Sequence, residues 1–282
     1  MGIDTIKDFK LMANTMRIDI VKMLAEAKSG HPAGPLGLAE IFAALFFKEL
    51  HLNPKNPKDP SRDRLILSNG HVAPVLYSAL ARAGFFPVEK LTTLRKLGSP
   101  LQGHPSMVWM DCIENSSGPL GQGLSIACGI AIGLRMEKNP ARVYCVTSDG
   151  EHQEGATWEA VMLAAKYKLD NLVNIIDRNY IQIDGRTEDV MPLDPLDEKY
   201  RAFNWHTISI DGHDFIQIFR ALEEARKTKG KPTVIIANTV PGKGVTFMEK
   251  FYEWHGKPPT KEQAEKAVTE LEQERERIAK EN

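Results

Sequence analysis

Apolar residues recur at helical spacing along the first third of the chain. From Phe9 to Ala27 they return every three or four positions, which predicts an amphipathic helix. The glycine–proline pair in Ser29–Pro32 should end this helix. Further helical patterns cover three segments: 36–50, 74–83 and 88–97. The stretch 52–62 is rich in proline, asparagine and lysine and predicts a surface loop.

Short apolar runs alternate with helical patterns in the rest of the chain. Strands are predicted at 64–68, 143–147, 172–176, 205–210 and 233–238, and helices at 124–137, 157–167 and 215–226. Apolar runs without polar alternation are typical of strands buried on both faces. The pattern therefore predicts an α/β fold, a mostly parallel sheet flanked by helices on both faces. The charged tail from Thr260 carries one apolar stripe and predicts a surface helix.

Composition narrows the class of protein. The 282 residues are 42% hydrophobic, which suits one large or two modest domains, and no repeat or low-complexity linker divides them. The formal net charge of −1 argues against a nucleic-acid partner. No run approaches the roughly 20 apolar residues of a membrane span, and the N-terminus does not resemble a signal peptide. Three cysteines suit reduced thiols, so a soluble cytoplasmic protein is expected.

Polar residues and glycines follow the predicted strands. They form the segments Ser68–His71, Ser148–Gly150, Asp177–Asn179, Asp211–His213 and Thr239–Gly242. Ligands of open parallel sheets bind beyond the carboxyl ends of the strands, so a ligand site is expected at this edge.

Asp149 and Asn179 are the most specific pair among these residues. They lie about thirty residues apart, so one strand–helix–strand crossover would bring their side chains together. Carboxylate and amide oxygens suit Mg²⁺ or Ca²⁺, especially when a phosphate completes the coordination. Gly150 would let the backbone approach a diphosphate, and the following helix offers its N-terminus to the anion. The alternative interpretation is that Asp149 only caps that helix.

Six segments in order resemble one known family. Asp149-Gly150 followed by Asp177–Ile181 looks like the thiamine-diphosphate-binding motif. The other five are Ser29–Pro32, Ser68–His71, Gly103–Pro105, Gly118–Gly123 and Trp254–Gly256. Together, over about residues 11–259, they resemble the N-terminal, diphosphate-binding region of transketolase. The resemblance implies one diphosphate-binding (PP-type) domain over residues 1–282, with an N-terminal helical segment and a C-terminal surface helix.

The resemblance also implies roles for individual residues. Asp149, Asn179 and the main-chain carbonyl of Ile181 would hold a divalent metal, Mg²⁺ or alternatively Ca²⁺ or Mn²⁺. The metal would hold the diphosphate of thiamine diphosphate, which Gly150 and Asn179 would also contact. In the segment Gly118-Pro119-Leu120, the first and last residues would present backbone groups to the aminopyrimidine. Glu154 matches a family glutamate at a subunit interface, where acids link two active sites.

Four histidines, His31, His71, His104 and His255, lie beside glycine or proline in predicted loops. A single loop histidine is about as often structural, but the resemblance places all four around the thiazolium ring and the sugar. Imidazoles donate to hydroxyls and transfer protons near neutral pH. His104 and His31 are expected at the ketose oxygens, His71 near the diphosphate and the reacting carbon, and His255 in proton transfer. The remaining histidines are expected to be structural or solvated: His51, His152, His206 and His213.

Three positions depart from the family pattern. Ser148 replaces the first motif glycine, Pro241 replaces a lysine, and Tyr252 replaces a histidine found in many bacterial members. The run Trp254–Pro258 instead resembles the branch found in animals and in short, split bacterial forms.

The resemblance covers only the first domain of a full-length transketolase. The pyrimidine-binding domain, whose glutamate activates the cofactor, and the C-terminal domain are expected on a separate chain in an α2β2 assembly. Helix 124–137 and the helix after Glu154 are the interface candidates. This chain should be inactive without its partner.

The expected reaction is ketol transfer from a ketose phosphate to an aldose phosphate, as in the pentose phosphate pathway. One alternative is a related carboligase such as 1-deoxyxylulose-5-phosphate synthase, or a transketolase-like enzyme for another sugar. A second is a non-catalytic subunit that keeps the fold. A nicotinamide-dependent dehydrogenase is disfavoured because no strand precedes Gly118–Gly123 and Ile126 occupies the third glycine position.

Overall fold

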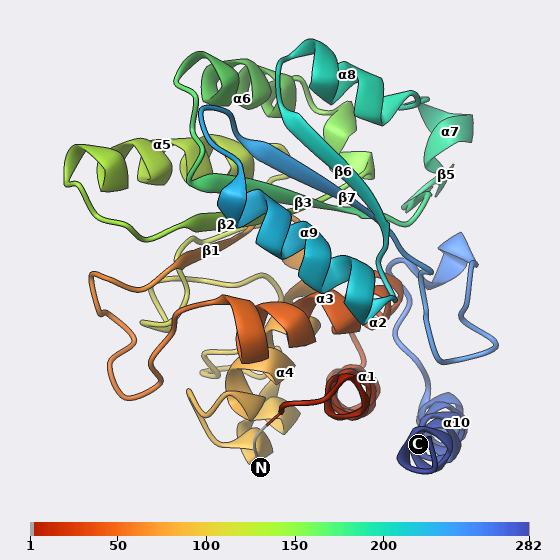
Figure 1. Ribbon diagram of the computed structural model, residues 1–282. Coiled ribbons are helices and arrows are strands. Elements are labelled where there is room, and N and C mark those ends of the chain that lie inside the picture. The colour runs from red at the N-terminus through yellow and green to blue at the C-terminus, as the bar shows by residue number, and fades with distance from the viewer. Residues whose placement is uncertain (1–2, 282) are drawn as a thin grey trace.

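Five parallel strands form the central sheet of the computed structural model, which describes residues 3–281 (Figure 1). In order across the sheet they are β1 Arg64–Leu67, β2 Val143–Ser148, β3 Leu172–Arg178, β7 Thr233–Asn238 and β6 His206–Asp211. Every pairing is parallel, and Ser148 lies opposite Asp177 in the register of β2 and β3. The predicted α/β fold is confirmed, and the carboxyl ends of β2 and β3 are neighbours.

Three helices cover one face of the sheet (Figure 1). They are α5 Gly123–Met136, α6 Gly155–Lys166 and α8 Leu196–Ala202. Their buried side chains share one hydrophobic core with Val143 and Cys145 of β2. Burial raises the pKa of the Cys145 thiol well above its ordinary value, so this cysteine is an unreactive core residue.

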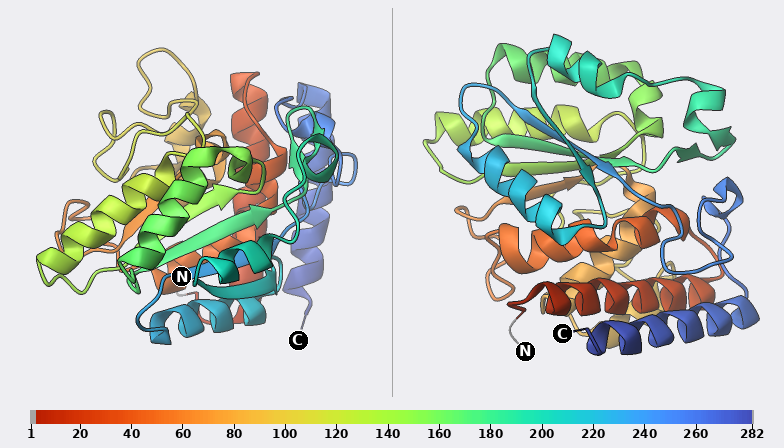
Figure 2. Two further views of the ribbon diagram at one scale, coloured as in Figure 1. Left: turned by 90° about the horizontal axis from the view of Figure 1, so that it is seen from above. Right: turned by 45° about the vertical axis from the view of Figure 1, so that its right-hand side comes forward.

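The opposite face is covered by α3 Ala39–Ala44, α4 Ala73–Arg82 and α9 Phe215–Lys227. Tyr144 and Val146 of β2 face this second core, so alternate residues of the strand are buried on opposite faces. Outside these helices, α1 Ile6–Ala27 and α10 Lys261–Ala279 lie side by side (Figure 2). The predicted apolar stripe of the tail helix is buried: Ala264, Ala267 and Leu271.

Two predicted helices differ in the structure. Segment 36–50 is divided into α2 Ala33–Gly37, α3 and the π-helical turn η1 Leu45–Glu49. Gly37 packs so closely on the loop after β7 that a Cβ there would lie 3.0 Å from the Val240 carbonyl oxygen. Segment 88–97 forms only the 3₁₀ helix η3 Val88–Thr93. Two threonine hydroxyls there bond nearby carbonyls, an arrangement that competes with a longer helix.

The segment after Asn179 contains short elements. They are the hairpin β4 Ile181–Gln182 and β5 Gly185–Arg186, followed by α7 Thr187–Val190 and α8. Three further 3₁₀ turns carry motif residues: η2 Gly70–Val72, η4 Gly150–Gln153 and η5 Tyr252–Trp254. Within residues 3–281, no helix has the length and apolar character needed to cross a membrane.

Candidate functional site

The edge formed by β2 and β3 brings Asp149 and Asn179 into one site. The Asp149 carboxylate is fully buried, and its Oδ1 accepts a hydrogen bond from the Gly150 N–H at 2.7 Å. Its Oδ2 accepts from the Tyr180 N–H at 2.7 Å and from Nη1 of Arg178 at 3.2 Å. Asp149 therefore caps the short turn that follows it and also contacts the segment after β3.

The Asn179 side chain is held by its neighbours on both atoms. Its Nδ2 donates to Oδ2 of Asp177 at 2.8 Å, and its Oδ1 accepts from the Ile181 N–H at 3.1 Å. The Ile181 carbonyl oxygen lies close to Gly150, where an added Cβ would come within 4.0 Å of it. Asp149 and the Ile181 carbonyl oxygen, two of the three donors that the resemblance assigns to a metal, therefore lie next to Gly150, and the third donor, Asn179, is bonded to the Ile181 N–H.

This donor set has acceptor capacity left for a cation. A carboxylate offers about four lone-pair positions and an amide oxygen two. The Asp149 carboxylate accepts three hydrogen bonds and Oδ1 of Asn179 accepts one, so each keeps one lone-pair position free. No group of three or more His, Cys, Asp or Glu residues able to hold a metal occurs in the described part of the chain. A metal here would therefore rely on one carboxylate, one amide and one main-chain oxygen, hard ligands that suit Mg²⁺ or Ca²⁺.

Two buried acids make this edge electronegative. Burial raises the pKa of Asp149 to about 6, and the Arg178 guanidinium opposes that rise. Burial raises the pKa of Asp177 to about 7, the hydroxyl of Thr239 opposes it, and the Asp149 charge adds to it. Removing these acids from water disfavours their charged forms, so a cation that restores the charge balance is favoured here.

The four predicted histidines lie together although they are spread over more than two hundred residues. The ring centroid of His31 lies 5.2 Å from that of His71, 5.4 Å from His255 and 6.5 Å from His104. The centroids of His71 and His255 are 5.0 Å apart. The expected grouping is present, and the role of each imidazole stays a prediction.

All four imidazoles are held in the neutral form at neutral pH. Burial lowers the pKa of His31 to about 4, and the charges of His255, Arg95 and His104 act in the same direction. Burial also lowers the pKa of His104 and His255, and that of His71 falls well below its ordinary value. Neutral imidazoles can both donate and accept hydrogen bonds, which suits contact with sugar hydroxyls.

This protonation state predicts acid sensitivity. Because the pKa of His31 falls from 6.5 to about 4 on folding, the unfolded chain binds more protons within that range. The free energy of unfolding should therefore drop as the pH falls from about 6.5 towards 4, by roughly 1 kcal/mol per pH unit after solvent screening. Urea unfolding at several pH values should show a shallower drop for a His31→Asn, His71→Asn double variant. Equal pH dependence in both proteins would contradict this prediction.

The segment Gly118–Leu120 lies beside two of these histidines. A Cβ on Gly70 would sit 2.5 Å from Oγ of Ser117 and 3.1 Å from the Gly118 nitrogen, so the loop after β1 needs glycine at position 70. A Cβ on Gly118 would lie 3.9 Å from Cγ of His104. This segment, expected to bind the aminopyrimidine, therefore borders the histidine cluster.

Several buried polar atoms around the cluster lack a protein partner. Within residues 3–281, both amide atoms of Asn69, Nδ1 of His31 and Oγ of Ser117 make no hydrogen bond. Most buried polar groups in proteins are paired, and leaving one unpaired costs about 1–3 kcal/mol. Donors and acceptors left unpaired next to an oxygen-rich edge fit a polar ligand such as thiamine diphosphate.

Glu151 organises the site without being predicted to do so. Its buried carboxylate accepts hydrogen bonds from the Ser68 hydroxyl, from the Gly121 N–H at 2.7 Å and from the Ser148 N–H at 3.2 Å. It therefore joins the loops after β1 and β2 to the segment before α5. The acid is visible in the sequence two positions after Asp149, but nothing there reveals its partners.

Glu154 has a different environment. It is exposed at the start of α6, and a Cβ on Gly121 would meet its Cβ at 2.8 Å. Its expected role at a subunit interface stays a prediction.

The other histidines have structural partners or lie near the surface. His152 bonds the Ser148 carbonyl and the Tyr200 hydroxyl, both at 2.7 Å. His213 bonds Glu40 at 3.0 Å, and His206 bonds Glu224 at 2.7 Å. His51 is exposed. These environments agree with the expectation of structural or solvated residues.

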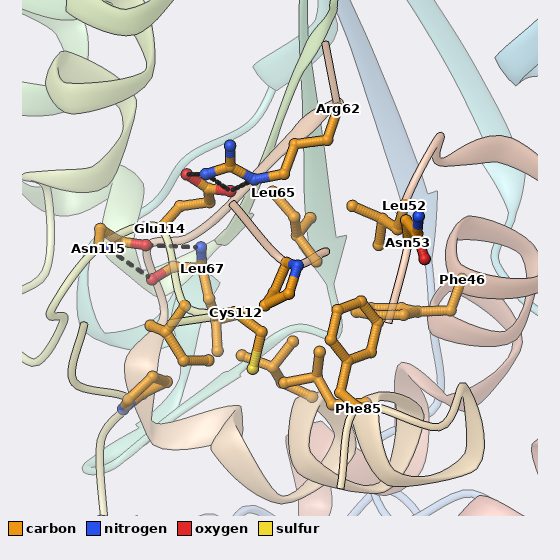
Figure 3. A pocket seen from close by; sticks show the side chains of 15 residues that line it. Phe46, Leu52, Asn53, Arg62, Leu65, Leu67, Phe85, Cys112, Glu114 and Asn115 are labelled. Carbon is orange, nitrogen blue, oxygen red and sulfur yellow. Dashed lines mark hydrogen bonds and ion pairs between the residues drawn. The ribbon is translucent and has the colours of Figure 1, made fainter. Parts of the chain in front are cut away.

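A small cavity lies beneath the loop that carries His104 (Figure 3). It measures about 20 Å³, room for about one water molecule and far too little for a coenzyme. Beside it, Arg62 and Glu114 form a bidentate pair at 2.8 Å, and the Asn115 amide bonds both backbone groups of Leu67. These contacts anchor the loop to β1, so the cavity is a packing feature of the scaffold.

Comparison with known proteins identifies the family of this chain. Residues 9–277 match the family model described as transketolase, thiamine diphosphate binding domain. The chain is 43% identical to a 6-deoxy-6-sulfo-D-fructose transketolase subunit of Clostridium sp. (strain MSTE9), over 95% of this chain and 97% of that one. It is 39% identical to one subunit of the apulose-4-phosphate transketolase of Phocaeicola vulgatus, over 98% of both.

Among solved structures, transketolase from Campylobacter jejuni superposes with a TM-score of 0.89 at 35% identity. The match covers 98% of this chain and 46% of that one, so the chain spans about half the length of that transketolase. Two relatives of matching length are thus named as subunits, while the solved enzyme continues well beyond the matched part. By sequence and by structure, this chain belongs to the family of transketolase thiamine-diphosphate-binding domains.

Proposed function

We propose that this chain is the cofactor-binding subunit of a two-subunit transketolase. With its partner it transfers a two-carbon ketol unit from a ketose phosphate to an aldose phosphate. The observation that carries the proposal is the set of oxygen donors from Asp149, Asn179 and Ile181 next to a cluster of four neutral histidines.

The metal and the diphosphate would occupy the edge of β2 and β3. Asp149, Asn179 and the Ile181 carbonyl would hold Mg²⁺, or Ca²⁺ or Mn²⁺, and Gly150 would leave room for the diphosphate. When bound, thiamine diphosphate supplies the reactive carbon that carries the ketol unit. The protein contributes position and electrostatics, and the Gly118–Leu120 segment, with Pro119 in its middle, would line the aminopyrimidine.

The histidines would act on the sugar. His31 and His104 would orient the ketose hydroxyl and carbonyl oxygens, and His71 would lie nearer the diphosphate. His255 would hold or move a proton at a sugar oxygen. Neutral imidazoles suit this work because each carries one donor and one acceptor nitrogen.

A second polypeptide would complete the site with the pyrimidine-binding and C-terminal domains, in an α2β2 assembly. Two full-length relatives that are named subunits support this proposal. So do exposed apolar side chains on α5 and α6: Ile126, Met136, Met162 and Leu163. Glu154 lies at the start of α6 and would face the same interface. The sparse cysteines support a cytoplasmic location, and the pentose phosphate pathway is the proposed metabolic setting.

Substrate choice needs a donor screen of the assembled enzyme. The two subunit relatives are named for different sugars, one with a sulfo group and one with a phosphate, so their names select no single substrate. We propose a ketose phosphate as the donor class. Xylulose 5-phosphate should serve as donor and pyruvate should not. A preference for pyruvate would favour the carboligase alternative.

Calorimetric titration of the chain tests whether the site binds the cofactor at all. Heat of binding is expected from thiamine diphosphate with Mg²⁺, and at least about tenfold weaker binding without Mg²⁺, since no cation would then link the diphosphate to Asp149 and Asn179. Thiamine, which lacks the diphosphate, is the matched control and should not bind. Equal affinity for thiamine and its diphosphate would contradict the proposed site. If neither compound binds, even with the partner present, the non-catalytic alternative is favoured.

A further inference from the structure

Arg178 is a buried cation that pairs with Asp149 of the proposed site. It closes β3, its side chain is 2% exposed, and it lies in sequence between Asp177 and Asn179. Its Nη1 donates to Oδ2 of Asp149 at 3.2 Å and to the Thr187 hydroxyl at 3.2 Å. No role for this residue follows from the motif.

The other end of the guanidinium reaches a different segment. Nη2 lies 2.6 Å from the Glu188 carboxylate and 2.9 Å from that of Asp194. Glu188 in turn accepts hydrogen bonds from the Leu193 N–H at 3.2 Å. One side chain therefore joins the turn after β2 to the segment 187–194 beyond the β4–β5 hairpin.

Tyr180 adds a backbone constraint at the same place. It has a φ of 63°, a left-handed conformation that is uncommon for a residue other than glycine. Its N–H donates to Oδ2 of Asp149 at 2.7 Å, and its ring lies 4.0 Å from the Arg178 guanidinium carbon. Such a conformation persists where surrounding contacts over-determine it, and it is often found at ligand sites.

We propose that Arg178 is the positioning residue of the metal and diphosphate site. Arg178 and the Tyr180 N–H both donate hydrogen bonds to Oδ2 of Asp149. The free acceptor position of this carboxylate is therefore on Oδ1, where the cation would bind. By stacking on Tyr180, Arg178 fixes the turn that presents Asn179 and the Ile181 carbonyl. The donors are thus held in place before the cofactor arrives, which lowers the entropic cost of binding. This inference rests on the proposed function, because it assumes that these donors bind a metal.

Arginine suits this task better than lysine would. The planar guanidinium directs separate N–H donors to partners on two sides. Here Nη1 donates to Asp149 and Thr187, and Nη2 contacts Glu188 and Asp194. A lysine ammonium would keep the positive charge but could not reach both sides in a fixed geometry.

The test compares Arg178→Met and Arg178→Lys with the full wild-type chain. Calorimetry measures the affinity for thiamine diphosphate at saturating Mg²⁺, and for Mg²⁺ at saturating thiamine diphosphate. The methionine variant should bind Mg²⁺ about 10–100-fold more weakly, as expected when a partner of a metal ligand is lost. The lysine variant should lie between it and wild type. Electron paramagnetic resonance of Mn²⁺ gives a direct second readout, since unbound Mn²⁺ has a distinct signal.

Arg62→Met is the matched control. Arg62 forms a bidentate ion pair with Glu114 at 2.8 Å (Figure 3). It precedes β1, whereas Asp149 follows the carboxyl end of the parallel strand β2. This variant should lower the melting temperature while leaving both affinities within about twofold of wild type, as expected for the loss of a structural ion pair without a binding role.

The outcomes separate the inference from the proposed function. If wild type, alone and with its partner, does not bind thiamine diphosphate and Mg²⁺, the proposed function fails. If wild type binds and Arg178→Met binds equally well, only the positioning role is wrong. If the methionine variant does not fold, Arg178→Lys decides, and wild-type affinity in that variant overturns the inference.

Discussion

Replacing Asp149 by alanine should lower the affinity for thiamine diphosphate with Mg²⁺ by at least about 100-fold. Loss of a residue that only hydrogen-bonds to a metal ligand already lowers metal affinity by about 10–100-fold, and Asp149 is proposed as a ligand itself. Asp149 is the only carboxylate of the proposed donor set. The asparagine amide and the Ile181 carbonyl that would remain carry no formal charge. Without Asp149, the metal has little to offset its dehydration, and the diphosphate loses its link to the protein.

The expected cost to the fold is smaller than this loss of binding, although the N–H groups of Gly150 and Tyr180 lose their acceptor. Burial raises the pKa of Asp149 to about 6, so desolvation of the charged form already offsets much of what its hydrogen bonds contribute. Arg178 keeps two carboxylate partners in the variant, Glu188 and Asp194. A small change in melting temperature combined with lost binding would assign Asp149 to the ligand and not to the scaffold.

Asp63→Ala is the control for this experiment. Asp63 is a buried carboxylate that also accepts two backbone hydrogen bonds, from the His51 N–H at 2.9 Å and the Arg142 N–H at 2.8 Å. It lies before β1, at the opposite edge of the sheet. This variant should lose stability and keep its affinity for the cofactor. Tight binding by Asp149→Ala would overturn the metal site and would support the helix-cap interpretation alone.

The site residues that directly follow β2 and β3 could be predicted from the sequence. Apolar runs located β2 and β3, and parallel pairing of neighbouring strands then places Asp149 and Asn179 at one edge. The histidine cluster required the family resemblance, because no spacing rule joins His31 to His255. The ring centroids of His31 and His255 are 5.4 Å apart only because the loop after α1 and the segment after η5 converge.

Contacts between loops could not be predicted. Glu151 reads as one more surface acid, yet it is buried because Ser68 and Gly121 come from distant segments to meet it. Arg178 reads as a charged residue ending a strand, and its burial depends on acids that lie ten or more residues further on. The helix predicted over 36–50 failed for a similar reason, since the loop after β7 packs against Gly37.

This chain with thiamine diphosphate and Mg²⁺ should show only background ketol transfer, and adding its partner chain should raise the rate at least about 100-fold. That factor is the lower end of what one general acid or base contributes. The prediction rests on the proposed two-subunit assembly, in which the partner chain supplies the glutamate that activates the cofactor in the resembling family.

The assay measures transfer from xylulose 5-phosphate to ribose 5-phosphate, with each chain alone and with both together. Asp149→Ala combined with a wild-type partner should stay at background, which shows that the gained rate depends on this cofactor site. Glu154→Gln should bind cofactor normally and should lower the rate of the assembled enzyme only, because its exposed carboxylate would act across the interface. Substantial transfer by this chain alone would mean that it holds its own activating acid, and the two-subunit proposal would then be wrong.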